Sequence, residues 1–262
     1  MTKNELVVDN FELPNGINIY QINYNETNFM YNEVFIDKEY YKNGIVVNEG
    51  DCVFDIGSNI GMFSVFMSNL EKDIRLYAFE PIPPLYQVLC KNMDRHNPKA
   101  KIYNMAFGET NKTEIFTFYP NNSIMSGLHT NEEDDKSCFL KTYIDKNLSD
   151  EDQELLLQYS NEILEGRFIN EKYECTVTTI DDFIEKNNID VIHLLKIDAE
   201  KSEYNILLGL AKNWDKVKQL VIEVHSEEIL NNVTELLERK GYVLKIDNIS
   251  GNLFLVYATL SC

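Results

Sequence analysis

The sequence predicts an α/β domain built on a mostly parallel β-sheet. Apolar runs of strand length alternate with stretches of helical spacing, which is typical of parallel strands joined by right-handed crossovers. The chain has 262 residues, of which 44% are hydrophobic, and this is enough to bury the core of one such domain. The alternation begins with a strand over 52–56, a helix over 59–70, a strand over 75–80, a helix over 83–95 and a strand over 101–106.

Residues 1–50 precede this alternation and predict an N-terminal extension. Asn15-Gly16 lies between apolar residues, which favours a β-hairpin over 11–20. Apolar residues at helical spacing then predict a helix from Glu26 to Tyr41, ended by Asn43-Gly44. This helix either packs against the domain or covers a ligand pocket, and packing alone is the simpler expectation.

The alternation continues after residue 106 and is then interrupted. Clean alternation over 113–119 predicts another strand. Between about 120 and 173 the pattern stops, and the segments 130–133 and 149–152 resemble capping boxes that open helices. We therefore expect a helical insertion over about 120–173, which is either a lid over a site or a charged surface excursion.

The sheet resumes after the insertion and ends the chain. Strands are expected at 174–178, 194–198 and 220–224, with helices from Asp181, from Ser202 and up to Lys240. The last two strands, 242–246 and 253–257, are separated by a short turn, which predicts an antiparallel edge on the parallel sheet. Residues 51–262 are thus expected to form one domain that carries the extension and the insertion.

Charge and cysteine content restrict the classes of partner. The chain has 43 acidic and 24 basic residues and a net charge of −19, which repels phosphate backbones and argues against nucleic acid as a partner. No apolar run is long enough to span a membrane, and the N-terminus has no apolar signal core. Five scattered cysteines without C-x-x-C pairing favour a reducing, cytoplasmic location.

The turn after the first strand of the alternation carries the strongest functional signal. It reads D-I-G-S-N-I-G, and its glycines allow the backbone to approach a ligand closely. The spacing differs from the G-x-G-x-x-G fingerprint of dinucleotide sites, and D-x-G-x-N-x-G is the form found where S-adenosylmethionine binds. We therefore predict a methyltransferase whose cofactor contacts Asp55, Gly57, Ser58, Asn59 and Gly61.

The ends of the next two strands complete the predicted cofactor site, because ligands of open α/β sheets bind beyond the carboxyl ends of the strands. Glu80 ends the second strand, where a carboxylate can accept hydrogen bonds from both hydroxyls of a ribose. Asn104, Met105 and Ala106 end the third strand. Phe79 and Met105 are candidates to sandwich the adenine, with a place in the hydrophobic core as the alternative.

Later strand ends supply the candidate catalytic residues. His225 follows the strand 220–224, and an imidazole there is a base with a pKa near neutrality. We predict that His225 is the general base and that Asp198 and Glu223 orient it or the substrate, with Asp198 also contacting the cofactor. A structural histidine is the alternative for His225. The same three residues could hold a divalent metal ion, which we rank below the base. Within the insertion, His129 and Met125 are tentative substrate contacts.

These motifs together resemble the FkbM-type methyltransferases. The resemblance implies a Rossmann-like class I methyltransferase fold with a mostly parallel seven-stranded sheet and an antiparallel edge strand. It also implies transfer of a methyl group from S-adenosylmethionine to a hydroxyl oxygen. The segments that carry it are 53–61, 78–81, 104–108, 178–182, 194–200 with Glu203, and 221–225.

The sequence departs from the family at one position. The family often has Gly after the Glu of its Lys-Ile-Asp block, whereas here Glu200 is followed by Lys201 and Ser202. This form looks like members that serve polyketide and peptide assembly lines, which suggests a natural-product hydroxyl, free or tethered to a carrier protein, with Lys201 as a cation near the mouth of the site.

Two other functional classes stay open at this point. One is an NAD(P)-dependent oxidoreductase on the same fold, and the other is a non-catalytic cofactor-binding domain of a larger assembly. The sequence leaves the acceptor and the oligomeric state undefined.

Overall fold

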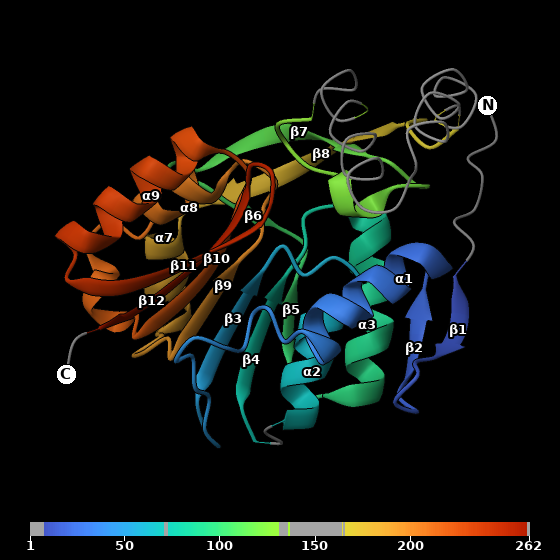
Figure 1. Ribbon diagram of the computed structural model, residues 1–262, viewed down its shortest axis with the longest axis horizontal. Coiled ribbons are helices and arrows are strands. Elements are labelled where there is room, and N and C mark those ends of the chain that lie inside the picture. The colour runs from blue at the N-terminus through green and yellow to red at the C-terminus, as the bar shows by residue number, and fades with distance from the viewer. Residues whose placement is uncertain (1–7, 71–72, 131–135, 137–163, 165, 261–262) are drawn as a thin grey trace.

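A seven-stranded sheet forms the centre of the computed structural model, which describes residues 8–70, 73–130, 136, 164 and 166–260 (Figure 1). The strand order is β11-β12-β10-β9-β3-β4-β5. The strands are β3 (Cys52–Ile56), β4 (Arg75–Phe79), β5 (Lys101–Tyr103), β9 (Leu194–Ile197), β10 (Gln219–Val224), β11 (Tyr242–Ser250) and β12 (Leu253–Leu260). The mostly parallel sheet is confirmed, but its antiparallel strand, β12, lies one position in from the edge, between β10 and β11.

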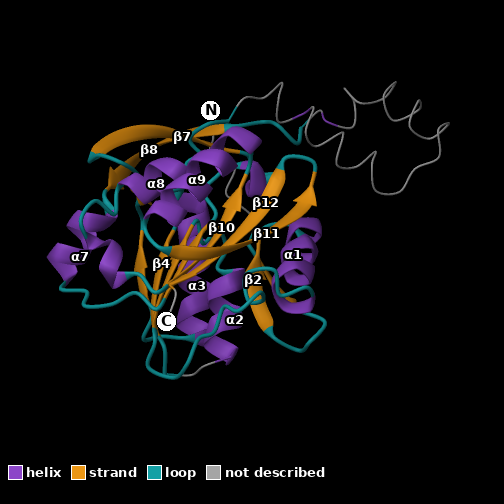
Figure 2. Cartoon of the chain, turned by 60° about the vertical axis from the view of Figure 1, so that its left-hand side comes forward, coloured by secondary structure: helices purple, strands orange, loops and turns teal. Residues whose placement is uncertain are grey.

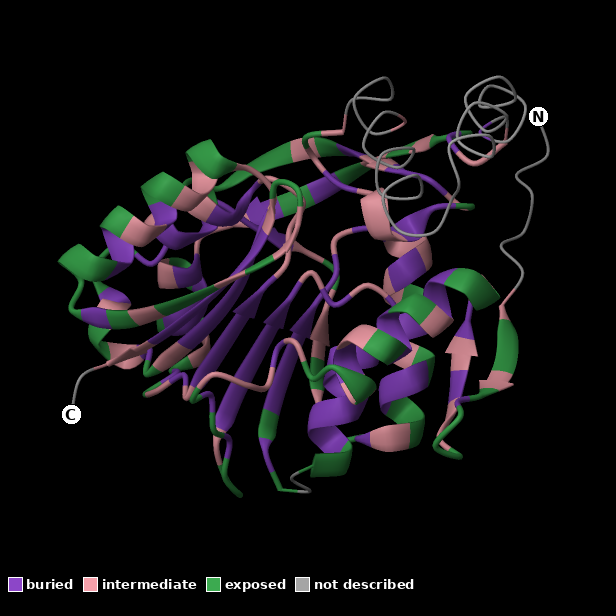
Figure 3. Cartoon of the chain, viewed as in Figure 1, coloured by how far each residue is buried: buried purple, intermediate pink, exposed green. Residues whose placement is uncertain are grey.

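Helices cover both faces of this sheet (Figure 2). On one face α2 (Met62–Leu70) and α3 (Pro83–His96) pack against alternate strand residues such as Val53 and Leu194. On the other face lie α7 (Ile180–Asn187), α8 (Glu203–Leu208), η3 (Asn213–Lys216) and α9 (Glu227–Arg239). The central strands are therefore buried on both sides (Figure 3), as the continuous apolar runs of the sequence predict.

The N-terminal extension packs on the α2–α3 face. The predicted hairpin is present as β1 (Asp9–Glu12) and β2 (Asn18–Gln21). The following helix is shorter than predicted: α1 (Tyr24–Tyr31) passes into a π-helical turn, η1 (Asn32–Ile36). Because the helix ends early, the chain turns back toward the sheet and buries Tyr40.

A second, three-stranded sheet flanks the carboxyl ends of the central strands, in the order β6-β8-β7. It consists of β6 (Ala106–Phe107), β8 (Glu171–Thr178) and β7 (Lys112–Phe118), so the predicted strand over 101–106 is divided between β5 and β6. After β7 comes a short 3₁₀ turn, η2 (Ser123–Met125). Most of the predicted insertion, including its capping boxes, lies outside the described residues.

The described part of the chain contains no helix that is both long and apolar enough to cross a membrane.

Candidate active site

Close contacts within the protein require glycine at both glycine positions of the turn, Gly57 and Gly61. Gly57 has φ +74°, and a Cβ there would lie 1.7 Å from the backbone oxygen of Asp198. Gly61 has φ +90°, and a Cβ would lie 2.6 Å from Cδ1 of Leu89 on α3. The first glycine therefore lets the turn lie against the end of β9, and the second lets α2 approach α3. Their predicted contact with a cofactor stays a prediction.

Glu80 is held at the end of β4 by the turn and by its own chain. Its Oε2 accepts a hydrogen bond from the Asn59 amide at 2.9 Å, and its Oε1 accepts one from the Ile82 amide at 2.9 Å. Burial raises the pKa of the carboxyl to about 8, although both amides oppose this. The Asn104 side chain donates to the backbone oxygen of Glu80 at 2.9 Å and so ties the ends of β4 and β5 together.

The two predicted adenine contacts, Phe79 and Met105, belong to the same apolar cluster but differ in burial. Phe79 is fully buried, and its ring lies against those of Tyr103, Phe107 and Phe183 on the α7 face. This favours the alternative that Phe79 belongs to the core, and its contact with the adenine stays a prediction. Met105 is half-buried and packs at the border of the same cluster. Asn104 is exposed and Ala106 is buried.

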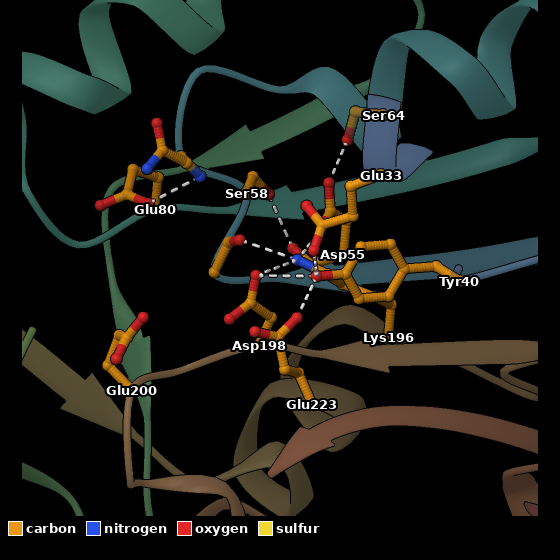
Figure 4. A network of polar contacts seen from close by, with 12 residues as sticks. Glu33, Tyr40, Asp55, Ser58, Ser64, Glu80, Lys196, Asp198, Glu200 and Glu223 are labelled. Carbon is orange, nitrogen blue, oxygen red and sulfur yellow. Dashed lines mark hydrogen bonds and ion pairs between the residues drawn. The ribbon is translucent and has the colours of Figure 1, made fainter. Parts of the chain in front are cut away.

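Lys196, a residue that the sequence analysis missed, is the centre of a buried polar cluster beneath the turn (Figure 4). Its Nζ lies 3.3 Å from Asp55 Oδ1 and 3.3 Å from Asp198 Oδ2, and it donates to the Gly57 backbone oxygen at 2.9 Å. Burial would lower the pKa of Lys196, but Asp198 and Asp55 outweigh it and raise the pKa above its usual value. We call Lys196, Asp55 and Asp198 the Lys196 centre.

Two polar side chains reach this cluster from the N-terminal extension (Figure 4). The Tyr40 hydroxyl donates to Glu223 and lies 3.3 Å from Glu33 Oε1 and 3.4 Å from Asp198 Oδ2. Burial, together with Glu223 and Asp198, raises the pKa of Glu33 well above its usual value. The expectation that this segment serves packing alone is therefore wrong. The sequence signal that could have indicated this role is an acidic residue, Glu33, among the apolar positions of the predicted helix.

The predicted catalytic residues Asp198, Glu223 and His225 come together at the ends of β9 and β10. The Nδ1 of His225 lies 2.9 Å from Glu203 Oε1, and its Nε2 lies 3.5 Å from Glu200 Oε1 and 3.5 Å from Glu223 Oε1. We call His225, Glu200 and Glu203, with Glu223 and Asp198 at its border, the His225 centre.

The protonation of this centre does not favour His225 as a free base. Burial would lower the pKa of His225, but Glu200 and Glu203 outweigh it and raise the pKa well above its usual value. A protonated imidazole has no lone pair with which to accept a proton. Burial raises the pKa of Asp198 to about 7 against the effect of Lys196. Burial also favours a higher pKa for Glu223, yet hydrogen bonds from His225 and Tyr40 hold it below its usual value.

The predicted metal alternative changes in one member. Asp198, Glu200 and His225 each offer one ligand atom, and these three atoms all lie within 4.8 Å of one another. Glu200 thus takes the place of Glu223 in the predicted set of ligands. One carboxylate oxygen of Glu223 is the acceptor of the Tyr40 hydroxyl.

The predicted substrate contacts differ in their surroundings. His129 is exposed, and Met125 packs beside a small apolar group made of Tyr119, Leu164 and Phe168. Lys201 has φ +72°, and its amide donates to Glu203 Oε1 at 2.9 Å. The positive φ explains why glycine suits this position in the family.

Three segments far apart in the sequence meet at Ser123, on η2. Its amide and hydroxyl both donate to Glu26 Oε2 of α1, at 2.8 and 2.5 Å, and its backbone oxygen accepts from the Asn59 side chain at 3.4 Å. Gly127 follows, and a Cβ there would lie 2.9 Å from Cβ of Glu200. The residues after β7 therefore contact both the glycine turn and the His225 centre.

Comparison with known proteins identifies the family. A family model described as "Methyltransferase FkbM domain" matches residues 55–244. The chain belongs to this family. It is 32% identical over 240 residues to the 31-O-demethyl-FK506 methyltransferase FkbM of Streptomyces tacrolimicus. The match covers 91% of this chain and 90% of that protein.

Two further similarities extend the comparison. The AMB antimetabolite synthetase AmbE of Pseudomonas aeruginosa is 31% identical to this chain over 243 residues. The match covers 90% of this chain but only 11% of the length of AmbE. The crystal structure of the FkbM methyltransferase from Methylobacillus flagellatus has a TM-score of 0.53 at 16% identity, covering 83% of this chain and 46% of that one.

The FkbM match confirms the resemblance found in the sequence, including the methyltransferase class and the Rossmann-like fold. Both charged centres lie within the matched residues, whereas Glu33 and Tyr40 precede them. The N-terminal extension thus adds two polar side chains to a site that the FkbM domain otherwise supplies.

Proposed function

We propose that this FkbM-family protein is an S-adenosylmethionine-dependent O-methyltransferase that acts on a hydroxyl of a natural product. One observation carries the proposal. The glycine turn, Glu80 and the polar cluster of Asp198, Glu223 and His225 all lie along the carboxyl ends of β3, β4, β9 and β10. A cofactor on the turn therefore has ionisable side chains beside it, at the edge where ligands of open α/β sheets bind.

The residues present fit S-adenosylmethionine, which when bound supplies an activated methyl group on a cationic sulfur. Glu80 is buried at the strand end where a ribose is expected, and Asn59 on the turn donates its amide to it. The carboxylates of the two charged centres outnumber their two cationic side chains, which suits a cationic cofactor. The turn residues 57–61 and Glu80 would hold it, with Asn104 and Met105 at the base end.

The acceptor oxygen loses its proton as it forms a bond to carbon, so a proton acceptor has to lie beside it. Asp198 and Glu223 are carboxylates at adjoining strand ends, with side chains that are 28% and 11% exposed. Asp198 is the more accessible of the two, and we assign it the role of accepting the proton from the acceptor hydroxyl. His225, between Glu200, Glu203 and Glu223, fixes these carboxylates. Orientation of the reactants and exclusion of water supply much of the acceleration.

The relatives support the class of acceptor. The Streptomyces relative is a methyltransferase of an O-demethyl compound, and AmbE is a synthetase of which this chain matches a small part. We therefore propose an alcohol of a natural product, either free or attached to a carrier protein.

The test is a methylation assay with isotope-labelled S-adenosylmethionine and a panel of free and carrier-tethered alcohols, read by mass spectrometry. We expect the label on an acceptor oxygen, and we expect S-adenosylhomocysteine, not NAD, to bind in calorimetry. Asp198→Asn should lose turnover while it still binds S-adenosylhomocysteine, and the exposed Glu109→Gln should match wild type. Preferential binding of NAD would contradict the proposal. Cofactor binding with no methylated product across the panel would favour a non-catalytic cofactor-binding domain.

A further inference from the structure

We propose that the His225 centre binds a divalent transition-metal ion through Asp198, Glu200 and His225. The binding site itself is independent of the methyl transfer, and only the role of the ion rests on the proposed function. The three residues come from different segments: Asp198 follows β9, Glu200 lies in the loop before α8, and His225 follows β10.

Glu203 fixes the orientation of His225. Its Nδ1 contacts Glu203 Oε1 at 2.9 Å, and Glu203 is fully buried and also accepts the Lys201 amide at 2.9 Å. Glu203 therefore fixes the ring and leaves Nε2 directed toward Glu200 and Glu223. Metal-binding histidines commonly donate their other ring N–H to a carboxylate in this way, which sets the tautomer that presents a lone pair to the ion.

The donor atoms lie at a spacing close to that of ligands sharing one ion. Two ligands that share one ion with bonds of about 2.1 Å lie roughly 3.0 to 3.5 Å apart. The Nε2 of His225 already lies 3.5 Å from Glu200 Oε1, and all three donor atoms lie within 4.8 Å of one another. The pair of His225 and Glu200 is thus already at the spacing of two ligands of one ion, and Asp198 completes the set within 4.8 Å.

Carboxylates surround the imidazole of His225. Glu200, Glu203 and Glu223 each lie within 3.5 Å of His225, and Asp198 lies beside them. Among the described residues, Oε2 of Glu203 is in addition buried without a hydrogen-bond partner. Carboxylate oxygens thus gather around one imidazole, which makes a mixed oxygen and nitrogen donor set of the kind that divalent ions bind.

The site is open enough to exchange an ion and to work with it. The side chains of Asp198, Glu200 and His225 are 28%, 25% and 13% exposed. Three protein ligands leave coordination positions for water or for the acceptor oxygen, and an ion there polarises the acceptor O–H bond. Asp198 offers the ion one carboxylate oxygen and keeps the other for the proton of the acceptor hydroxyl. One imidazole nitrogen with two carboxylates suits Mn²⁺ or Zn²⁺ better than Ca²⁺, which prefers oxygen donors alone.

The test measures metal binding without cofactor or acceptor. Protein treated with a chelator and then dialysed is titrated with Mn²⁺, followed by electron paramagnetic resonance of the free ion and by calorimetry. We expect one saturable site per chain, with Mn²⁺ and Zn²⁺ bound more tightly than Ca²⁺. Glu200→Gln and His225→Gln should each weaken Mn²⁺ binding more than 10-fold, and Glu203→Gln about 10- to 100-fold through the orientation of the ring.

The exposed Glu228→Gln, three residues after His225, makes the same change of charge and should bind Mn²⁺ as wild type does. Circular dichroism of each variant checks folding, and Glu200→Gln is the informative variant if His225→Gln fails to fold, because Glu200 is partly exposed. Absence of a saturable site, Ca²⁺ bound at least as tightly as Mn²⁺, or unchanged affinity in Glu200→Gln would each overturn the proposal. Calorimetry with S-adenosylhomocysteine on the same samples reports separately on the proposed function.

Discussion

The Lys196 centre and the His225 centre share Asp198, yet their balance of charge is opposite. Lys196 is 4% exposed at its side chain, and its ammonium contacts two carboxylates and a backbone oxygen. His225 is 13% exposed at its side chain, and three carboxylates surround a single imidazole. The cation of the first centre is buried and fully paired, whereas the imidazole of the second centre is more exposed and lies among an excess of negative charge.

This difference shows how one strand edge can combine stability with reactivity. A buried cation with complete partners is costly to disturb, because removal of the cation leaves buried carboxylates without compensation. A partly exposed anionic cluster keeps its charge available to a ligand. Substitution of Lys196 should therefore change mainly the free energy of unfolding, and substitutions of Glu200 and His225 should change mainly binding.

The largest expected effect comes from Lys196→Met. The change leaves Asp55 and Asp198 without their ammonium, and we expect the free energy of unfolding to fall by about 3 to 5 kcal/mol, as when one partner of a buried ion pair is removed. Urea unfolding at pH 7 measures it. Lys212→Met is the matched control, because the Lys212 side chain is 69% exposed, and it should change stability by less than about 0.5 kcal/mol. Equal effects of the two variants would remove the contrast between the centres.

Glu80 lies at the same edge of the sheet, where backbone amides donate to its carboxyl. It tests how burial changes the pKa of one carboxyl. Its pKa is raised to about 8 in the folded state, so the folded protein binds a proton more tightly than the unfolded chain. The stabilisation is complete below the unfolded pKa, near 4.5, and is lost as the pH rises through 8. Between pH 6 and pH 8 we expect stability to fall by about 2 kcal/mol from this group.

Urea unfolding across this pH range, with Glu80→Gln beside wild type, checks that expectation. Glutamine cannot ionise, so the variant should lose this part of the pH dependence. An unchanged slope in Glu80→Gln would show that Glu80 is ionised in the folded protein at neutral pH.

Tyr40→Phe tests the side chain that joins the N-terminal extension to both centres. The variant keeps the ring over Lys196, at 5.2 Å from Nζ, and removes the hydroxyl that donates to Glu223. We expect a loss of about 1.5 kcal/mol, typical of a hydrogen bond to a charged group. Tyr31→Phe in the same segment is the control: the Tyr31 ring stacks on Phe35, and its loss of a hydroxyl should cost less than about 0.5 kcal/mol. A cost for Tyr40→Phe no larger than this would separate the extension from the site energetically.

The sequence predicts the parts of this molecule that depend on local patterns. The alternation of apolar runs gives the strands and helices, and the strand-end rule brings Asp55, Glu80, Asp198 and Glu223 to one edge. The splitting of 101–106 into two strands follows from pairing with β8, and no local pattern encodes that partner.

The missed residues depend on tertiary contacts. Lys196 stands in an apolar strand, and its role appears only when β9 lies beside β3 and the turn. Glu33 and Tyr40 reach the site because α1 gives way to a π-helical turn and the chain reverses. Phe79 was ambiguous for the opposite reason, because an apolar residue next to a strand end fits a core and a ligand pocket equally well.

The smallest effect, from Lys201→Gly, asks whether the His225 centre holds backbone strain. Lys201 has φ +72°, and a side chain in this region costs about 1 to 2 kcal/mol, while glycine adds about 0.5 to 1 kcal/mol of entropy in the unfolded chain. We therefore expect Lys201→Gly to raise the free energy of unfolding by about 0.5 kcal/mol. Lys240→Gly is the control, because Lys240 has φ −87° at the end of α9 and should gain nothing. A loss of stability in Lys201→Gly larger than in Lys240→Gly would mean that contacts of the lysine side chain outweigh the strain, and the centre would then depend on Lys201 for more than its backbone.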